Sequence, residues 1–137
     1  MSFEEKSVWV QLISMVALLG TYSVLAARML AGGVDALPAF VPLFIVAILF
    51  MVIVLVAGHV ACAVVSRPEG RDERDRLIAW RAESNSSWLL GAGVILAITG
   101  LVLSIDNVWI AHCLLLSMFM SELARFVLQL VYYRRGM

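Results

Sequence analysis

Charged side chains are scarce in this 137-residue chain: Asp, Glu, Lys and Arg make up 15% of it, whereas hydrophobic residues make up 63%. That balance lies far outside the usual range of soluble proteins, so the chain is expected to sit in a membrane. Ten basic and ten acidic residues cancel to a net charge of zero. A generally basic surface is therefore excluded, and we predict no nucleic-acid partner.

Cysteine and catalytic motifs are also rare or missing. Cys62 and Cys113 lie inside apolar runs, which is typical of buried thiols rather than of a disulfide framework or a zinc ribbon. His112 and Cys113 offer metal ligands, but His59 is expected near the opposite end of the membrane, so we predict no metal site and no cofactor. Glycine-rich phosphate loops, HExxH and CxxC motifs and a Ser/His/Asp set are absent, and we expect no enzyme.

Four long apolar runs make up most of the chain. A bilayer core of about 30 Å needs about 20 apolar residues, so each run can cross it, provided that the last one continues through Glu122 and Arg125. We predict an all-α membrane protein with four transmembrane helices in an antiparallel up-and-down bundle, forming a single domain over residues 1–137. The expected helices cover residues 7–30, 38–66, 86–105 and 108–133, with a polar connection at 67–86.

Two alternatives, a soluble helical bundle and a cleaved signal peptide, agree less well with the sequence. A soluble four-helix bundle needs a polar face on each helix, whereas these runs are apolar all round. A cleaved signal peptide needs a basic flank and an apolar stretch of roughly 7–15 residues. The first run is longer and follows Glu4-Glu5-Lys6, so we expect it to remain as a membrane helix.

Basic residues are divided unequally between the two sides of the predicted membrane. If the four helices alternate in direction, only Arg28 lies on one side. The other side carries Lys6, Arg67, Arg71, Arg74, Arg76, Arg81, Arg134 and Arg135. The positive-inside rule places this richer side in the cytoplasm, which predicts a multi-pass protein of the inner membrane with both termini cytoplasmic. Trp9, Trp88, Trp109 and Tyr132-Tyr133 lie near predicted helix ends, where such rings prefer the interface.

The segment from Arg71 to Arg76 has mixed charges at helical spacing and is followed by Leu77, Ile78 and Trp80. This pattern predicts an amphipathic cytoplasmic extension before the third helix, in the form of an interfacial helix that runs into that span. A simple solvated extension is the plainer alternative. The residues expected to contact lipid headgroups or a partner are Arg71, Arg74, Arg76, Arg81, Arg134 and Arg135.

Glu122 is the costliest residue of the predicted spans, because a charge at membrane depth costs roughly 3 kcal/mol on insertion scales. Arg125 and Gln129 follow on the same helix face. Counting the helical rise from the cytoplasmic ends predicts a polar intramembrane layer of Gln11, Ser14, His59, Glu122, Arg125 and Gln129. Two interpretations stay open: an internal salt bridge that sets helix register, or a site for a proton, cation or polar ligand.

The second half of the chain resembles a family of small, uncharacterised bacterial inner-membrane proteins. The resemblance is carried by Asp72-Glu73-Arg74-Asp75, by Arg81 and by the closing Leu130-Val131-Tyr132-Tyr133-Arg134-Arg135-Gly136. It implies a bacterial origin and the same four-helix topology. It implies no activity.

These observations predict a non-enzymatic membrane accessory or oligomer-forming protein, because four spans without a sizeable extramembrane domain leave little room for a catalytic site. Its expected partners are membrane lipids and a second copy or another membrane protein. The alternative is a small oligomeric transporter or channel, coupled to protons or cations through Glu122 and His59.

Overall fold

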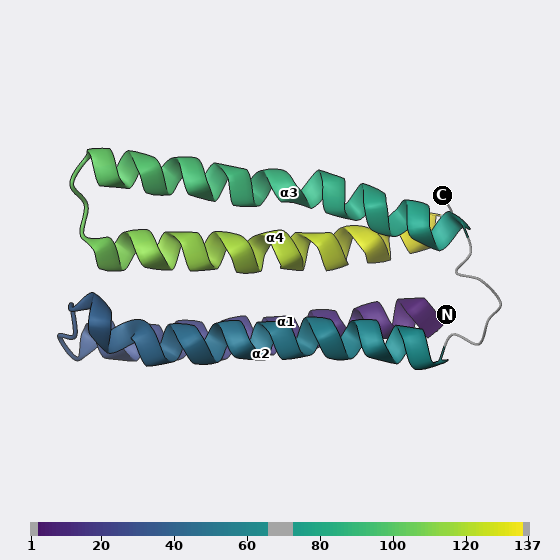
Figure 1. Cartoon of the computed structure of the whole chain (residues 1–137), viewed down its shortest axis with the longest axis horizontal. Coiled ribbons are helices and arrows are strands. Elements are labelled where there is room, and N and C mark those ends of the chain that lie inside the picture. Colours follow the sequence, from purple (N-terminus) through teal and green to yellow (C-terminus); the bar gives the residue numbers. More distant parts are fainter. Residues whose placement is uncertain (1–2, 66–72, 136–137) are drawn as a thin grey trace.

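The computed structural model describes residues 3–65 and 73–135, which form four helices (Figure 1). Their bounds are α1 Phe3–Ala31, α2 Leu37–Val65, α3 Glu73–Val102 and α4 Asn107–Arg135. All four are long and apolar enough to cross a membrane. The prediction of an all-α protein with four candidate membrane-spanning helices is therefore confirmed.

Helix α3 begins at Glu73, well before the expected start near residue 86, and ends at Val102 rather than at 105. Glu73 and Asp75 lie in its first turn, where carboxylates favour the positive end of the helix dipole. Thirty residues span about 45 Å, more than a bilayer core, so the charged start of α3 continues the same helix beyond the apolar part. Arg67 and Arg71 lie outside the described residues.

Both short connections begin with the same type of helix end. After α1, the Val34 amide donates to the Met29 carbonyl (3.1 Å) and Gly33 adopts a φ of 81°. After α3, the Ile105 amide donates to the Gly100 carbonyl (2.9 Å) and Ser104 adopts a φ of 57°. These are Schellman ends, which need a left-handed residue, and they turn each helix back towards its neighbour.

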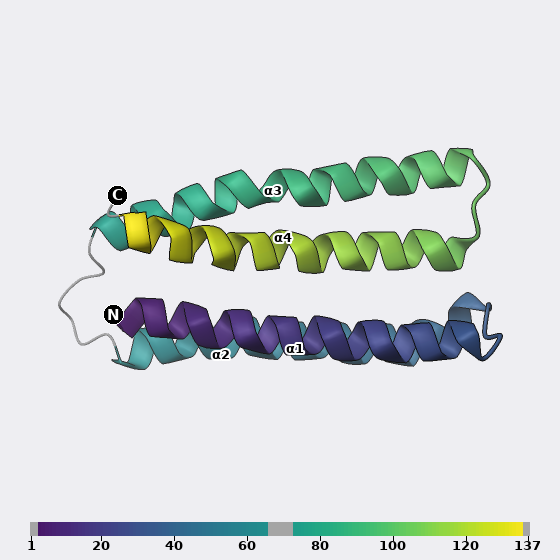
Figure 2. The same ribbon diagram turned by 180° about the vertical axis from the view of Figure 1, so that it is seen from behind.

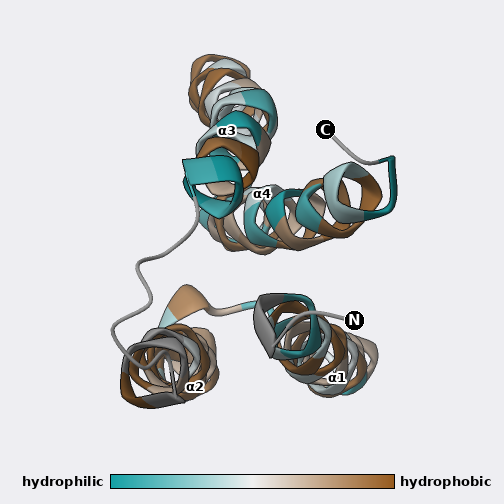
Figure 3. Ribbon diagram, turned by 90° about the vertical axis from the view of Figure 1, so that its right-hand side faces the viewer, coloured by the Kyte–Doolittle hydropathy of each residue, from teal (hydrophilic) through white to brown (hydrophobic). Residues whose placement is uncertain are grey.

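Successive helices run in alternate directions, and both chain ends lie at one end of the molecule, as Figure 1 and Figure 2 show from opposite sides. The end-on view in Figure 3 shows α4 between the α3 and α1 layers. Helix α3 packs chiefly against α4, α1 packs against both α4 and α2, and α2 touches α4 only slightly. The order across the molecule is therefore α3, α4, α1, α2, which is more open than a four-helix bundle with a shared central core.

Most of the largest buried side chains lie between α4 and the α1–α2 pair, the exception being Ile78 on α3. Met15, Phe40, Phe119 and Phe126 are all 2% exposed or less. The α3–α4 contact is built differently, from small buried residues on α3: Ala82, Ser86, Gly93, Ala97 and Gly100. Small residues let two helix backbones approach closely, as is usual in membrane proteins.

Little of each candidate span is buried within the chain. The buried share of the most apolar window is 17% in α1 and α2 and 22% in α3 and α4. Most of the remaining apolar surface is thus available to lipid or to another protein. The open order of the helices is the structural reason for this low burial.

Candidate functional site

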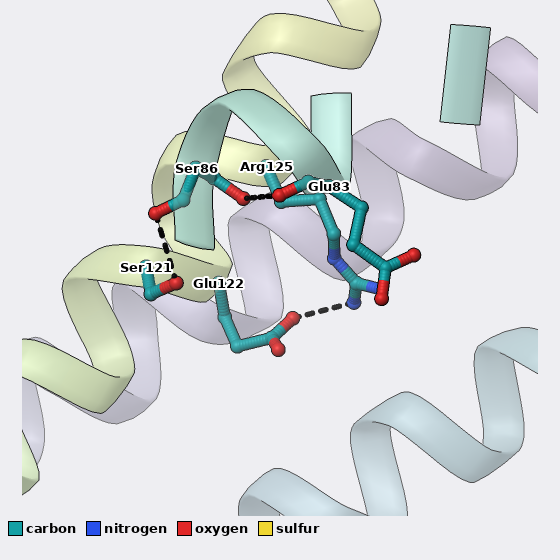
Figure 4. Close-up of polar contacts among 5 residues, drawn as sticks. All are labelled: Glu83, Ser86, Ser121, Glu122 and Arg125. Atoms are coloured by element: carbon teal, nitrogen blue, oxygen red, sulfur yellow. Dashed lines mark hydrogen bonds and ion pairs between the residues drawn. The ribbon is translucent and has the colours of Figure 1, made fainter. Parts of the chain in front are cut away.

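Glu122 and Arg125 form an ion pair on α4, with Glu122 Oε2 2.5 Å from Arg125 Nη2 (Figure 4). The two side chains are 26% and 17% exposed, respectively. Glu122 Oε2 and Arg125 Nε nevertheless complete no hydrogen bond of good geometry in the described part of the chain. The close approach shows that the groups are paired, and charge rather than a well-directed hydrogen bond holds them together.

Helix α3 approaches this pair through a short polar path that the sequence did not indicate. The Ser121 hydroxyl on α4 donates to the Ser86 carbonyl on α3 at 3.2 Å, and the Ser86 hydroxyl donates to the Glu83 carbonyl at 3.1 Å (Figure 4). Ser86 is 3% exposed. The bond from Ser121 to the buried Ser86 therefore ties α4 to α3 one residue away from Glu122.

Gln11 and Ser14, the two α1 residues of the predicted layer, line a cavity of about 410 Å³ between α1 and α2. Gln11 is buried, and its amide donates to the Ser7 hydroxyl at 3.2 Å. Its side chain lies over Gly58, where no room is left for a Cβ atom. The α1 polar residues thus face α2 in a group of their own, and Glu122 does not line this cavity.

The register between α1 and α4 shows why the two groups are separate. It is set by two contacts: Arg134 lies 5.9 Å above the Trp9 ring, and the rings of Tyr22 and Phe119 are 6.1 Å apart. Because the helices run in opposite directions, Gln129 lies about level with Ser14. Glu122 lies seven residues further along, or roughly 10 Å nearer the other end. His59 belongs to α2, and its side chain lies outside the described part.

Of the predicted headgroup-contacting arginines, Arg71 lies outside the described residues, and the others belong to the first part of α3 and the last turn of α4. Arg74 and Arg76 line an open hollow of about 700 Å³ beside Trp80 on α3, and Arg81 lies just beyond Trp80. Arg134 and Arg135 are exposed in the last turn of α4. The start of α3 and the end of α4 therefore bring several arginines to one end of the molecule, where Glu73 and Asp75 also lie.

His112 occupies an aromatic cluster that sequence reasoning missed. Its ring centroid lies 5.0 Å from that of Phe40, 5.3 Å from that of Phe44 and 5.9 Å from that of Tyr22. Nδ1 lies 2.7 Å from the Val108 carbonyl, which can only accept, so Nδ1 carries the proton. No pattern in the sequence indicates that α1 and α2 supply the rings around His112.

Two polar atoms in this cluster are buried without a hydrogen-bond partner in the described structure: His112 Nε2 and the Tyr22 hydroxyl. An unpaired buried hydroxyl costs about 1–3 kcal/mol. Tyr22→Phe is therefore expected to leave the unfolding free energy unchanged or raise it by about 1 kcal/mol, measured by thermal unfolding in detergent.

Tyr132→Phe is the matched control, because the Tyr132 hydroxyl accepts a hydrogen bond from Asn85 at 2.8 Å. It should lose about 0.5–1 kcal/mol. A loss on Tyr22→Phe larger than that of the control would contradict the unpaired state of the Tyr22 hydroxyl.

No group of three His, Cys, Asp or Glu side chains able to hold a metal ion occurs in the described ranges 3–65 and 73–135. Cys113 is a free, half-buried thiol. Compared with protein-family models, curated proteins and solved structures, the chain matches none. The resemblance to small bacterial membrane proteins therefore stays a prediction, and the function must be argued from the molecule itself.

Proposed function

We propose that this chain is a non-enzymatic, oligomer-forming protein of the bacterial inner membrane, with both termini in the cytoplasm. The observation that supports it most is the open order of the helices. Because α3 packs chiefly on α4 while α2 packs on α1, the two outer helices leave α4 uncovered between them. A second copy of the chain is the proposed occupant of that space.

The uncovered part of α4 forms the floor of an apolar groove of about 440 Å³. Its lining comes from α2, α3 and α4 and consists of Phe44, Ile48, Leu90, Ala111, Leu114, Leu115 and Met118. Such a groove suits the apolar face of a helix, and association through it adds no unpaired polar group.

Next to the groove, α3 presents small residues outwards. Ser87 and Gly91 are exposed one turn apart, and a Cβ atom added at Gly91 would meet nothing within 4 Å. The Ser87 hydroxyl is satisfied by the Ser84 carbonyl at 3.0 Å. Two small residues four positions apart favour close contact between membrane helices, which supports a protein rather than lipid at this face.

The distribution of charge supports the proposed orientation. Lys6 lies in the first turn of α1, and Arg74 and Arg76 in the first turns of α3, at the same end as the close of α4. Arg28 lies in the last turn of α1, at the opposite end. The positive-inside rule then places the end with both termini in the cytoplasm.

The test is self-association of the full chain in lipid vesicles, measured by energy transfer between labelled copies as the protein is diluted. We expect Gly91→Leu to weaken association at least about tenfold, because the added side chain would hold the helices apart. Gly20→Leu is the matched control, since Gly20 on α1 is also exposed with nothing within 4 Å.

Unchanged association in the control would support the position of the interface. A wild-type chain that stays monomeric at every dilution would refute oligomer formation. An equal loss from both glycine variants would place the interface elsewhere.

A further inference from the structure

At the arginine-bearing end of the molecule, α3 and α4 form a polar cavity that is open to the surface. Trp80, Arg81, Ser84 and Asn85 line it from α3, and Tyr132 lines it from α4. Its volume is about 370 Å³, within the usual range of ligand pockets. Unlike the apolar groove above, it brings a cation and several hydrogen-bonding groups together.

The hydrogen bond within the cavity leaves a donor available. Asn85 Nδ2 donates to the Tyr132 hydroxyl oxygen at 2.8 Å, so the hydrogen of that hydroxyl remains to donate to something else. Ser84 and Arg81, both exposed, line the same cavity from α3. Three donors, one of them a planar cation, suit the oxygens of a phosphate group.

The position of the cavity along the helices favours a lipid as the source of that phosphate. Trp80 is 65% exposed and, with Tyr132, places aromatic rings near the proposed inner membrane surface, where they are most favourable. The apolar part of α3 begins beyond Ser84 and Asn85 and leads on to the exposed Trp88. A bound phosphate would thus have apolar helix surface beside it for an acyl chain.

We infer that the cavity lined by Trp80, Arg81, Ser84, Asn85 and Tyr132 binds the phosphate of an anionic phospholipid from the cytoplasmic leaflet. Arg81 supplies the charge, and the Tyr132 and Ser84 hydroxyls supply the directed donors. This site is independent of the proposed oligomer interface, because the groove between α2 and α3 shares no lining residue with it.

The experiment counts lipids bound to the purified full chain by native mass spectrometry. Phosphatidylglycerol is titrated against phosphatidylcholine with the same acyl chains, and glycerol 3-phosphate is added as a soluble competitor. We expect phosphatidylglycerol to bind at least about tenfold more tightly than phosphatidylcholine. Arg81→Gln should remove most of that difference, and Tyr132→Phe should reduce it about threefold.

Arg135→Gln is the control, because Arg135 is an exposed arginine at the same end that does not line the cavity. An equal loss in this variant would show a general charge effect and overturn the site. Equal binding of the two lipids would also overturn it. Full displacement by an equimolar amount of glycerol 3-phosphate would identify a site for soluble phosphate instead. If Arg81→Gln does not fold, Tyr132→Phe and Ser84→Ala carry the same test.

Discussion

Replacing Arg125 by leucine is expected to lower the free energy of unfolding by about 3 kcal/mol. The change leaves the Glu122 carboxylate, 26% exposed, without the guanidinium that lies 2.5 Å from it. An unpaired carboxylate within an apolar helix costs several kcal/mol, whereas the pair largely compensates its own burial. The measurement is unfolding of the purified chain in mixed micelles, followed by helical circular dichroism.

The double variant Glu122→Leu/Arg125→Leu distinguishes the removal of both charges from the removal of one charge, which leaves the other unpaired. It should recover most of the lost stability, because two apolar side chains of similar size replace a pair whose desolvation is costly. A double variant as unstable as Arg125→Leu would contradict this account.

A Glu122 variant also tests the alternative that the protein is a transporter. Proton or cation flux through reconstituted wild-type protein, abolished in a stably folded Glu122→Gln variant, would favour transport over a packing role.

Gly93→Ala is expected to destabilise the protein by about 2 kcal/mol, in the range of overpacked cores. A Cβ atom at Gly93 would overlap both the Cβ and the hydroxyl of Ser117 on α4. Rotation of the serine side chain cannot move its own Cβ, so α3 and α4 would have to separate. Thermal unfolding in detergent measures the loss.

Two further variants make this prediction specific. Gly93→Ala/Ser117→Gly moves the methyl group from one helix to the other and should recover most of the stability. Gly91→Ala, at an exposed glycine with open space around it, should change stability by less than about 1 kcal/mol in a monomeric micelle. Since alanine favours a helix more than glycine does, a Gly91→Ala variant as unstable as Gly93→Ala would show that the loss does not come from contact with Ser117.

The location of the helices could be predicted well from the sequence, because an apolar run of sufficient length reports its own ability to cross a membrane. The start of α3 was predicted in part: the membrane span was expected from residue 86, after an amphipathic helix that leads into it, and α3 is one continuous helix from Glu73 onwards. Charge alone does not end a helix when the dipole and the spacing favour it.

The candidate site was only partly predictable from the sequence, because some of its contacts lie within one helix and others join different helices. Glu122 and Arg125 are three residues apart on one helix, so helical geometry alone brings them together. The contact between Gln11 and Gly58 and the hydrogen bond from Ser121 to Ser86, by contrast, join different helices. Nothing in the spacing along the chain indicates which helix faces meet.

Hydropathy and helical rise are local properties, and they account for the four helices, the unequal distribution of arginine and the pairing within α4. The order of the helices across the molecule, the aromatic cluster around His112 and the offset of Glu122 from Ser14 depend on how α1, α2 and α4 pack together. In a membrane protein that packing follows from close fit between side chains, because lipid surrounds apolar faces as readily as another helix does. Gly93 on α3 shows this dependence: its small size is visible in the sequence, but its neighbour, Ser117 on α4, is known only from the tertiary structure.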